Sequence, residues 1–77
     1  MDIREDFARN LRKFRRQKGL SQEALAHEAG VDRTYVSALE RCAYSATITM
    51  VEKLAMVLDI EPVELLQRTS KAGRVKR

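Results

Sequence analysis

The sequence is poor in the residues that cross-link small proteins or hold metal ions. It contains one cysteine and one histidine, Cys42 and His27, so it can form neither an internal disulfide nor a Cys/His cluster for zinc. Its three glycines make no glycine-rich loop of the kind that binds phosphate. A chain of 77 residues is one domain near the lower size limit for a self-sustaining core. We therefore expect stability from helix packing, aided by dimerisation, with no metal and no cofactor.

Long apolar runs are missing as well. No stretch approaches the roughly 20 apolar residues that a membrane-spanning helix needs. The opening MDIREDF lacks the basic-then-apolar order of a signal peptide. We expect a soluble, cytoplasmic protein without membrane contact, and one unpaired thiol fits a reducing compartment. An enzyme is the weakest interpretation, because the sequence offers no paired-carboxylate site and too little chain to enclose a pocket.

The formal charge of +4 is unevenly distributed. Residues 68–77 carry five bases and no acid, which leaves residues 1–67 with ten bases against eleven acids. A second block without acids, residues 9–18, holds six bases, whereas residues 43–67 have one lysine against four acids. This asymmetry suits a protein that binds a polyanion with one face. A solvated helix face followed by a basic tail explains the charge alone equally well.

Hydrophobic periodicity predicts an all-α protein with no strand. In the first helix Ile3, Phe7, Leu11 and Phe14 form a single apolar stripe. The five expected helices span about residues 3–18, 22–29, 33–41, 48–58 and 62–67. They make one domain over residues 1–67. Residues 68–77 have no apolar period and are expected to be a disordered basic tail that adds non-specific phosphate contacts.

Residues 22–41, QEALAHEAGVDRTYVSALER, contain two short helical patterns separated by a glycine. Ser21 and Asp32 are good N-cap residues, and Gly30 suits the left-handed end of a helix. The shared apolar patch consists of Leu25, Ala29, Val31, Val36 and Leu39. This spacing is typical of a helix-turn-helix, whose second helix is presented to the DNA major groove. A helical hairpin without a DNA role is the alternative.

Together with NLRKFRRQKGLSQEALA before it and ELL at residues 64–66, this run resembles the phage-repressor-type (Cro/repressor class) helix-turn-helix family. The resemblance covers roughly residues 7–66. It implies a compact five-helix DNA-binding domain and a sequence-specific transcriptional regulator of double-stranded DNA. The run DRTYVS followed by ER also resembles controller proteins of restriction–modification systems, which are small dimers that time expression of the endonuclease and of their own gene.

The resemblance assigns roles to single residues at the ends of the helices. An arginine at the position of Arg15 pairs in this family with a glutamate at the end of the recognition helix, here Glu40. A solvent-facing Arg15 is the alternative. Gln22 carries over as a phosphate contact, and Ser21 assists it.

The second helix of the motif is expected to read the bases. Arg33 suits guanine and Thr34 suits thymine, while Ser37 and Ala38, expected on the outer side, shape that specificity. For Tyr35 the sequence leaves two roles open, a contact to the DNA backbone and packing against the preceding helix.

The stretch ERCAYSATIT departs from the family pattern. Cys42 and Ala46 stand where members place a glycine and a proline, and a non-glycine residue in a left-handed position costs about 1 kcal/mol. We therefore expect the loop to take another route, with Arg41 and Tyr44 near phosphates or the minor groove. Cys42 is either a sensor of oxidation or simply a small half-buried residue.

Four apolar residues exceed what a finished core requires, namely Met50, Val57, Ile60 and Val63. The corresponding end of the family often forms a two-fold interface, so we expect a homodimer there, although such a stripe also suits a core. A dimer predicts a near-palindromic operator and autoregulation. With no effector domain in 77 residues, we expect no small-molecule ligand.

A hypothesis from another class is an antitoxin-like protein-interaction module that neutralises a partner protein. In that case the acidic residues 43–67 would grip a basic partner.

Overall fold

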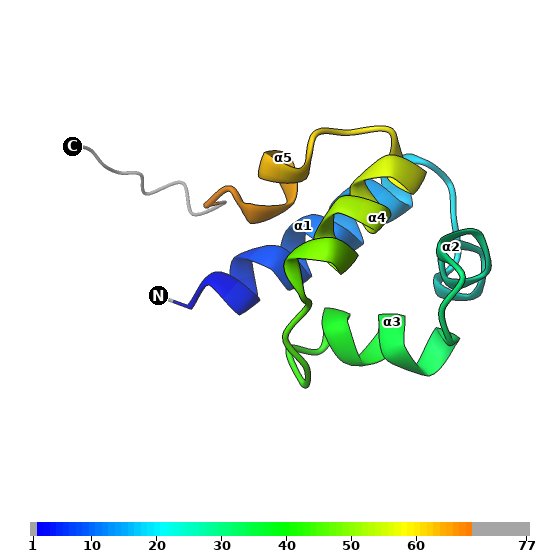
Figure 1. Cartoon of the computed structure of the whole chain (residues 1–77), viewed down its shortest axis with the longest axis horizontal. Coiled ribbons are helices and arrows are strands. Elements are labelled where there is room, and N and C mark those ends of the chain that lie inside the picture. Colours follow the sequence, from blue (N-terminus) through cyan, green and yellow to red (C-terminus); the bar gives the residue numbers. More distant parts are fainter. Residues whose placement is uncertain (1, 69–77) are drawn as a thin grey trace.

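The computed structural model describes residues 2–68, which form five α-helices and, within that range, no strand (Figure 1). The helices are α1 (Ile3–Gln17), α2 (Gln22–Ala29), α3 (Arg33–Glu40), α4 (Ile48–Leu58) and α5 (Pro62–Leu66). The predicted all-α, five-helix architecture is confirmed. Residues 69–77, nearly all of the predicted tail, lie outside the described residues.

Three helices end one residue earlier than predicted. Lys18 and Arg41 are the C-caps of α1 and α3, and Gln67, after α5, has an extended backbone with ψ of 146°. Each of these residues lies just where the chain leaves the helix, and sequence periodicity does not resolve such ends.

The helices pack as a shell around one apolar core. In Figure 1, α2 lies at one end of the molecule and α3 runs along one edge, while α5 lies over α1 and α4. Every helix contributes one leucine that is at most 1% exposed, namely Leu11, Leu25, Leu39, Leu54 and Leu65. Burying such a side chain stabilises the fold by about 1.5–3 kcal/mol. The core therefore depends on all five helices, including the five-residue α5.

Four helices end in the same backbone motif, with a left-handed residue after the last turn. The left-handed residues are Gly19, Gly30, Cys42 and Asp59, with φ of 75°, 73°, 61° and 61°. At each end the next N–H donates to a carbonyl five residues back, for example Ala43 N to Ala38 O at 2.8 Å. These are Schellman motifs. The expectation that Cys42 would divert the loop is therefore wrong, because the chain accepts the strained conformation instead.

A polar clasp attaches the end of α5 to α1. The Asn10 amide, 2% exposed, donates to Leu65 O at 3.0 Å and to Gln67 O at 2.7 Å. The buried Asp6 carboxylate lies one turn away, with Arg68 Nε 3.5 Å from Oδ2 and Arg9 Nη1 3.4 Å from Oδ1. Residues 65–68 are thus held against α1, a feature that the sequence analysis did not anticipate.

Candidate nucleic-acid interface

The helix pair α2–α3 leaves one polar face of α3 uncovered. Val36 and Leu39, 0% and 1% exposed, hold the inner side of α3 in the core. On the opposite side Arg33 and Thr34 are exposed and Ser37 is half-buried. Asp32 caps the helix by accepting a hydrogen bond from Thr34 N at 2.8 Å, which fixes where this face begins. The three residues are therefore placed together on an accessible helix surface.

Ala38 does not belong to that surface. It is only 3% exposed, so its expected position on the outer side is wrong. The Schellman motif lies next to this residue, since Ala43 N donates to the carbonyl of Ala38. The loss of Ala38 leaves Arg33, Thr34 and Ser37 as the candidates for base reading.

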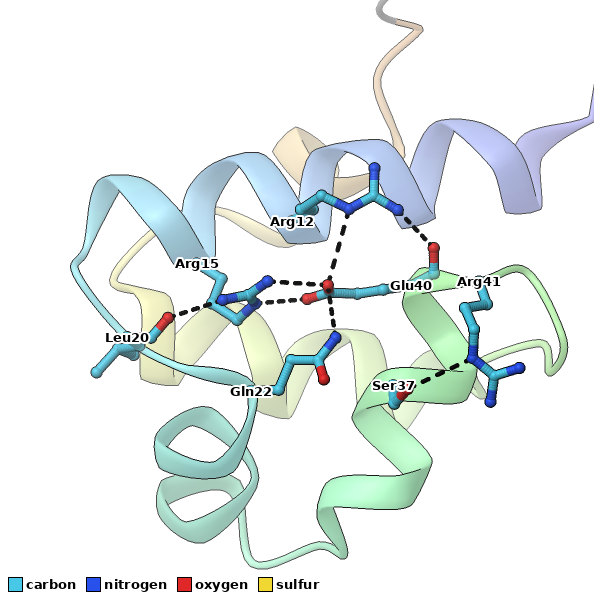
Figure 2. A network of polar contacts seen from close by, with 7 residues as sticks. All are labelled: Arg12, Arg15, Leu20, Gln22, Ser37, Glu40 and Arg41. Atoms are coloured by element: carbon cyan, nitrogen blue, oxygen red, sulfur yellow. Dashed lines mark hydrogen bonds and ion pairs between the residues drawn. The ribbon is translucent and has the colours of Figure 1, made fainter.

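The C-terminal end of α3 is anchored by a buried ion pair. Arg15 Nε of α1 donates to Glu40 Oε2 at 2.6 Å, and its Nη2 donates to Oε1 at 3.0 Å (Figure 2). The two side chains are only 11% and 3% exposed, so the alternative of a solvent-facing Arg15 is excluded. Nη1 of the same guanidinium donates to Leu20 O at 2.9 Å, which ties the α1–α2 turn to the pair.

Two more side chains converge on Glu40. Gln22 Nε2, at the start of α2, donates to Glu40 Oε1 at 3.1 Å. Arg12 Nη2 donates to the main-chain oxygen of Glu40 at 2.7 Å, and Arg12 Nε lies 3.8 Å from Oε1. Figure 2 shows these groups around one carboxylate. Sequence reasoning found the Arg15 contact and missed those of Arg12 and Gln22.

The network fixes the charge states of the pair. Burial alone raises the pKa of Glu40, but hydrogen bonds from Arg15 and Gln22 and the nearby arginine charges outweigh it, so the pKa lies below its ordinary value. The hydrogen bond to Glu40 likewise raises the pKa of Arg15. Both groups are therefore charged at neutral pH, and the pair keeps its full attraction.

The two residues expected to contact phosphate at the start of α2 already make hydrogen bonds within the chain. Ser21 Oγ accepts a hydrogen bond from Ala24 N at 3.0 Å, as an N-cap. Gln22 donates one amide hydrogen to Glu40. A hydroxyl and a primary amide each carry a further hydrogen. Each side chain therefore keeps one donor for an anion while its existing hydrogen bond within the chain holds it in position.

The chain after α3 carries an aromatic pair and an arginine. Tyr35 is half-buried and packs against the core, which favours the packing role left open by the sequence. Its ring lies 6.1 Å from that of Tyr44, which is 57% exposed. Arg41 is exposed and its Nε donates to Ser37 Oγ at 3.4 Å, on the outer side of α3. Cys42 is half-buried, with Sγ 3.5 Å from Arg4 O.

Three of the four residues predicted for the dimer interface are partly buried within the chain itself. Met50, Val57 and Ile60 are partly buried against the chain's own core, and only Val63 is exposed, at 61%. Other apolar side chains join Val63 at the surface: Ile48, Met56 and Leu66. These four residues are termed the apolar face. The sequence carried a signal for it, because Ile48 and Met56 share a helix side with Glu52, away from the core stripe.

Residues 2–68 contain neither a cluster of metal ligands nor a helix able to span a membrane. No group of three potential His, Cys, Asp or Glu metal ligands comes together there. In the same part of the chain, every helix is too short or too polar to cross a membrane.

Comparison with known proteins places this geometry in context. A family model described as helix-turn-helix matches residues 11–65. A hypothetical transcription factor of Neisseria meningitidis is 46% identical over 65 residues, which cover 84% of this chain and 61% of that protein. The restriction–modification controller protein C.AhdI of Aeromonas hydrophila has a similar structure, with a TM-score of 0.78 and 47% identity over 80% of this chain and 94% of that one. The biofilm regulator SinR, solved in complex with DNA, has a TM-score of 0.76 and 34% identity over 79% of this chain and 98% of that one.

Proposed function

The chain belongs to the helix-turn-helix family of DNA-binding transcriptional regulators, and we propose that it binds a near-palindromic operator in double-stranded DNA as a homodimer in the cytoplasm. The observation that carries the proposal is the uncovered polar face of α3, which is held at its end by the buried Arg15–Glu40 pair. Arg33, Thr34 and Ser37 are the proposed base-reading residues. An α-helix fits the major groove, and arginine is the common reader of guanine.

Backbone contacts complete the proposed interface. Ser21 and Gln22 stand at the N-terminus of α2, where main-chain N–H groups and the helix dipole favour an anion. Arg41 and Tyr44 lie beyond the C-terminal end of α3 and are exposed. Contacts from α2 and from the chain after α3 would set the register of α3 on the duplex without reading sequence.

The apolar face supports the homodimer. Ile48 is 88% exposed and Met56 is 74% exposed, and a surface depression of about 410 Å³ lies between α4 and α5, lined by Ile48, Val63 and Leu66. A two-fold interface at these helices, away from the polar face of α3, would present two recognition helices to half-sites about one helical turn apart.

A controller role is the specific form of this proposal. The likeness to C.AhdI, a restriction–modification controller protein, extends over 94% of that chain, and the run DRTYVSALER lies within the matched region. The chain spans only 61% of the Neisseria relative. We therefore base the proposal that the protein controls its own gene on its similarity to the controller protein C.AhdI.

A titration against DNA from immediately upstream of its own gene tests the function, with a random duplex of equal length as control. We expect a complex of two protomers with the upstream duplex, bound about a thousandfold or more tighter than the random duplex. Equal weak binding to both would contradict the proposal. Purification together with a second protein that abolishes DNA binding would instead favour the antitoxin-like module.

A further inference from the structure

We propose that Arg12 of α1 is an additional contact to the DNA backbone and couples that contact to the end of the recognition helix. The inference rests on the proposed function, and it deepens that function by assigning a phosphate site to a depression where α1 meets the end of α3. Arg12 was expected only to belong to a basic block, with no role of its own.

The depression has a volume of about 400 Å³, and Arg12 and Arg41 are among the residues that line it. Its glutamates are Glu5 and Glu40, but Glu40 is already paired with Arg15, which lies outside the lining. One of the three arginines in the lining is already paired with a buried aspartate, so two arginines face one glutamate that is not committed to Arg15. Such a surface attracts a phosphate more strongly than a single exposed lysine or arginine would.

Arg12 is held in place by its contacts with Glu40, and part of its guanidinium remains accessible to solvent. Its Nη2 donates to Glu40 O at 2.7 Å, its Nε lies 3.8 Å from Glu40 Oε1, and its side chain is 39% exposed. Nη1 makes neither of these contacts. A guanidinium has five donors in a rigid fork that matches phosphate. Arg12 can therefore keep its Glu40 contacts while Nη1 meets an anion, and little rotamer freedom is lost on binding.

Arg12 lies close to the other proposed backbone anchors. Arg12 and Gln22 approach the same oxygen of Glu40 from α1 and α2, as Figure 2 shows. Arg41, bonded to Ser37 on the outer side of α3, lines the same depression as Arg12. A phosphate held by Arg12 would therefore belong to the same backbone contact region as Gln22 and Arg41.

This arrangement makes Arg12 a positioning residue as well as a backbone contact. Its bond to the main chain of Glu40 links any phosphate it holds to the last turn of α3. The contact carries no base information, so its loss weakens binding to every duplex alike. One fewer counterion is then released on binding, so the negative slope of log K against log salt becomes shallower by about 0.9.

The test compares Arg12→Gln with Arg16→Gln. Both variants lose one positive charge from α1, but Arg16 lies four residues later and is exposed, outside the lining of the depression. Affinities are measured by fluorescence anisotropy on the upstream duplex and on a random duplex. The salt concentration is varied over about a fourfold range, from roughly 50 to 200 mM. Thermal unfolding of each variant is recorded alongside, and Arg12→Lys serves as a charge-conserving variant.

We expect Arg12→Gln to reduce the salt slope by about 0.9 on both duplexes, Arg16→Gln to leave it unchanged, and Arg12→Lys to restore it. An equal slope for the Arg12→Gln and Arg16→Gln variants, or a lowered melting temperature with an unchanged slope, overturns the inference. If the wild type prefers neither duplex, sequence-specific regulation fails, but the slopes on the random duplex still decide the role of Arg12. If the wild type binds no DNA, both proposals fall.

Discussion

Arg15 and Glu40 lie 25 residues apart in the chain and join α1 to the last residue of α3 through two hydrogen bonds of 2.6 and 3.0 Å. The pair is buried, and Arg12 and Gln22 donate further hydrogen bonds to Glu40. Removing one partner from such a pair leaves an uncompensated buried charge, which is costly. This carboxylate therefore helps to set the orientation of the recognition helix, together with the core contacts of that helix.

Glu40→Gln is expected to lower the free energy of unfolding at pH 7 by roughly 3 kcal/mol, because Arg15 loses its counter-charge. Urea denaturation measures the change, with Glu28→Gln, on the exposed side of α2, as a control that should stay within about 0.5 kcal/mol of the wild type. The difference between the wild type and Glu40→Gln should also depend on pH. The pKa of Glu40 in the fold lies below its ordinary value of 4.5, so the stabilisation is complete above that pH and is lost as the pH falls through the lowered pKa. A difference that stays constant from pH 7 to about pH 3 would show that the charge of Glu40 is not what stabilises the fold.

Cys42→Gly should raise the free energy of unfolding by about 1 kcal/mol. Cys42 has φ of 61°, where glycine adopts the left-handed conformation without the steric cost that other residues carry. The measurement is again urea denaturation, under reducing conditions. Ala43→Gly, at the next residue, should give no gain, because that position shows no positive φ. If both variants were destabilised alike, the packing of the half-buried thiol would outweigh the relief of strain.

Arg33→Ala should weaken binding to the specific duplex by roughly 1–3 kcal/mol and leave binding to a random duplex nearly unchanged. The reason is that a base contact contributes only when the right base is present. Competition titrations with the two duplexes provide the measurement. Equal losses on both would make Arg33 a phosphate contact and would remove it from the base-reading set.

Val63→Asp should convert the proposed homodimer to a monomer at micromolar concentration. A carboxylate within the apolar face would be buried without a partner on association, which costs at least about 2 kcal/mol, or roughly thirtyfold in the dissociation constant. Sedimentation equilibrium measures the dissociation constant. His27→Asp, at an exposed position on α2, introduces the same acid elsewhere and should leave the dimer intact. An unchanged constant for Val63→Asp would place the interface outside this face.

The sequence predicted the features that depend on side-chain identity and period. Leu11 and Leu54 fall on helical apolar stripes, and Ser21, Asp32 and Gly30 mark helix ends by their own chemistry. The Arg15–Glu40 contact followed from the family resemblance, since two charged residues 25 positions apart show no local relationship.

What the sequence did not predict depends on main-chain acceptors and on the path of the chain. Arg12 donates to the carbonyl of Glu40, and Asn10 donates to carbonyls of residues 65 and 67. Every residue has a carbonyl, so nothing in the side chains marks these acceptors. Ala38 was misplaced because its burial depends on tertiary packing, which a small apolar side chain does not indicate. The left-handed conformation of Cys42 was not expected, because its side chain disfavours that conformation.

The clasp between α1 and the end of α5 has a consequence for the order of folding. Asn10 and Gln67 close a loop of 57 positions, against 25 for Arg15 and Glu40, and longer loops cost more entropy to close. We expect pulse-labelled hydrogen exchange to show α2 and α3 amides protected before those of α5; simultaneous protection would exclude this order. A chain emerging from the ribosome would then complete its reading surface first. The helix that carries Val63 would dock last, so newly made protomers of the proposed homodimer would recognise one another only after each has finished folding.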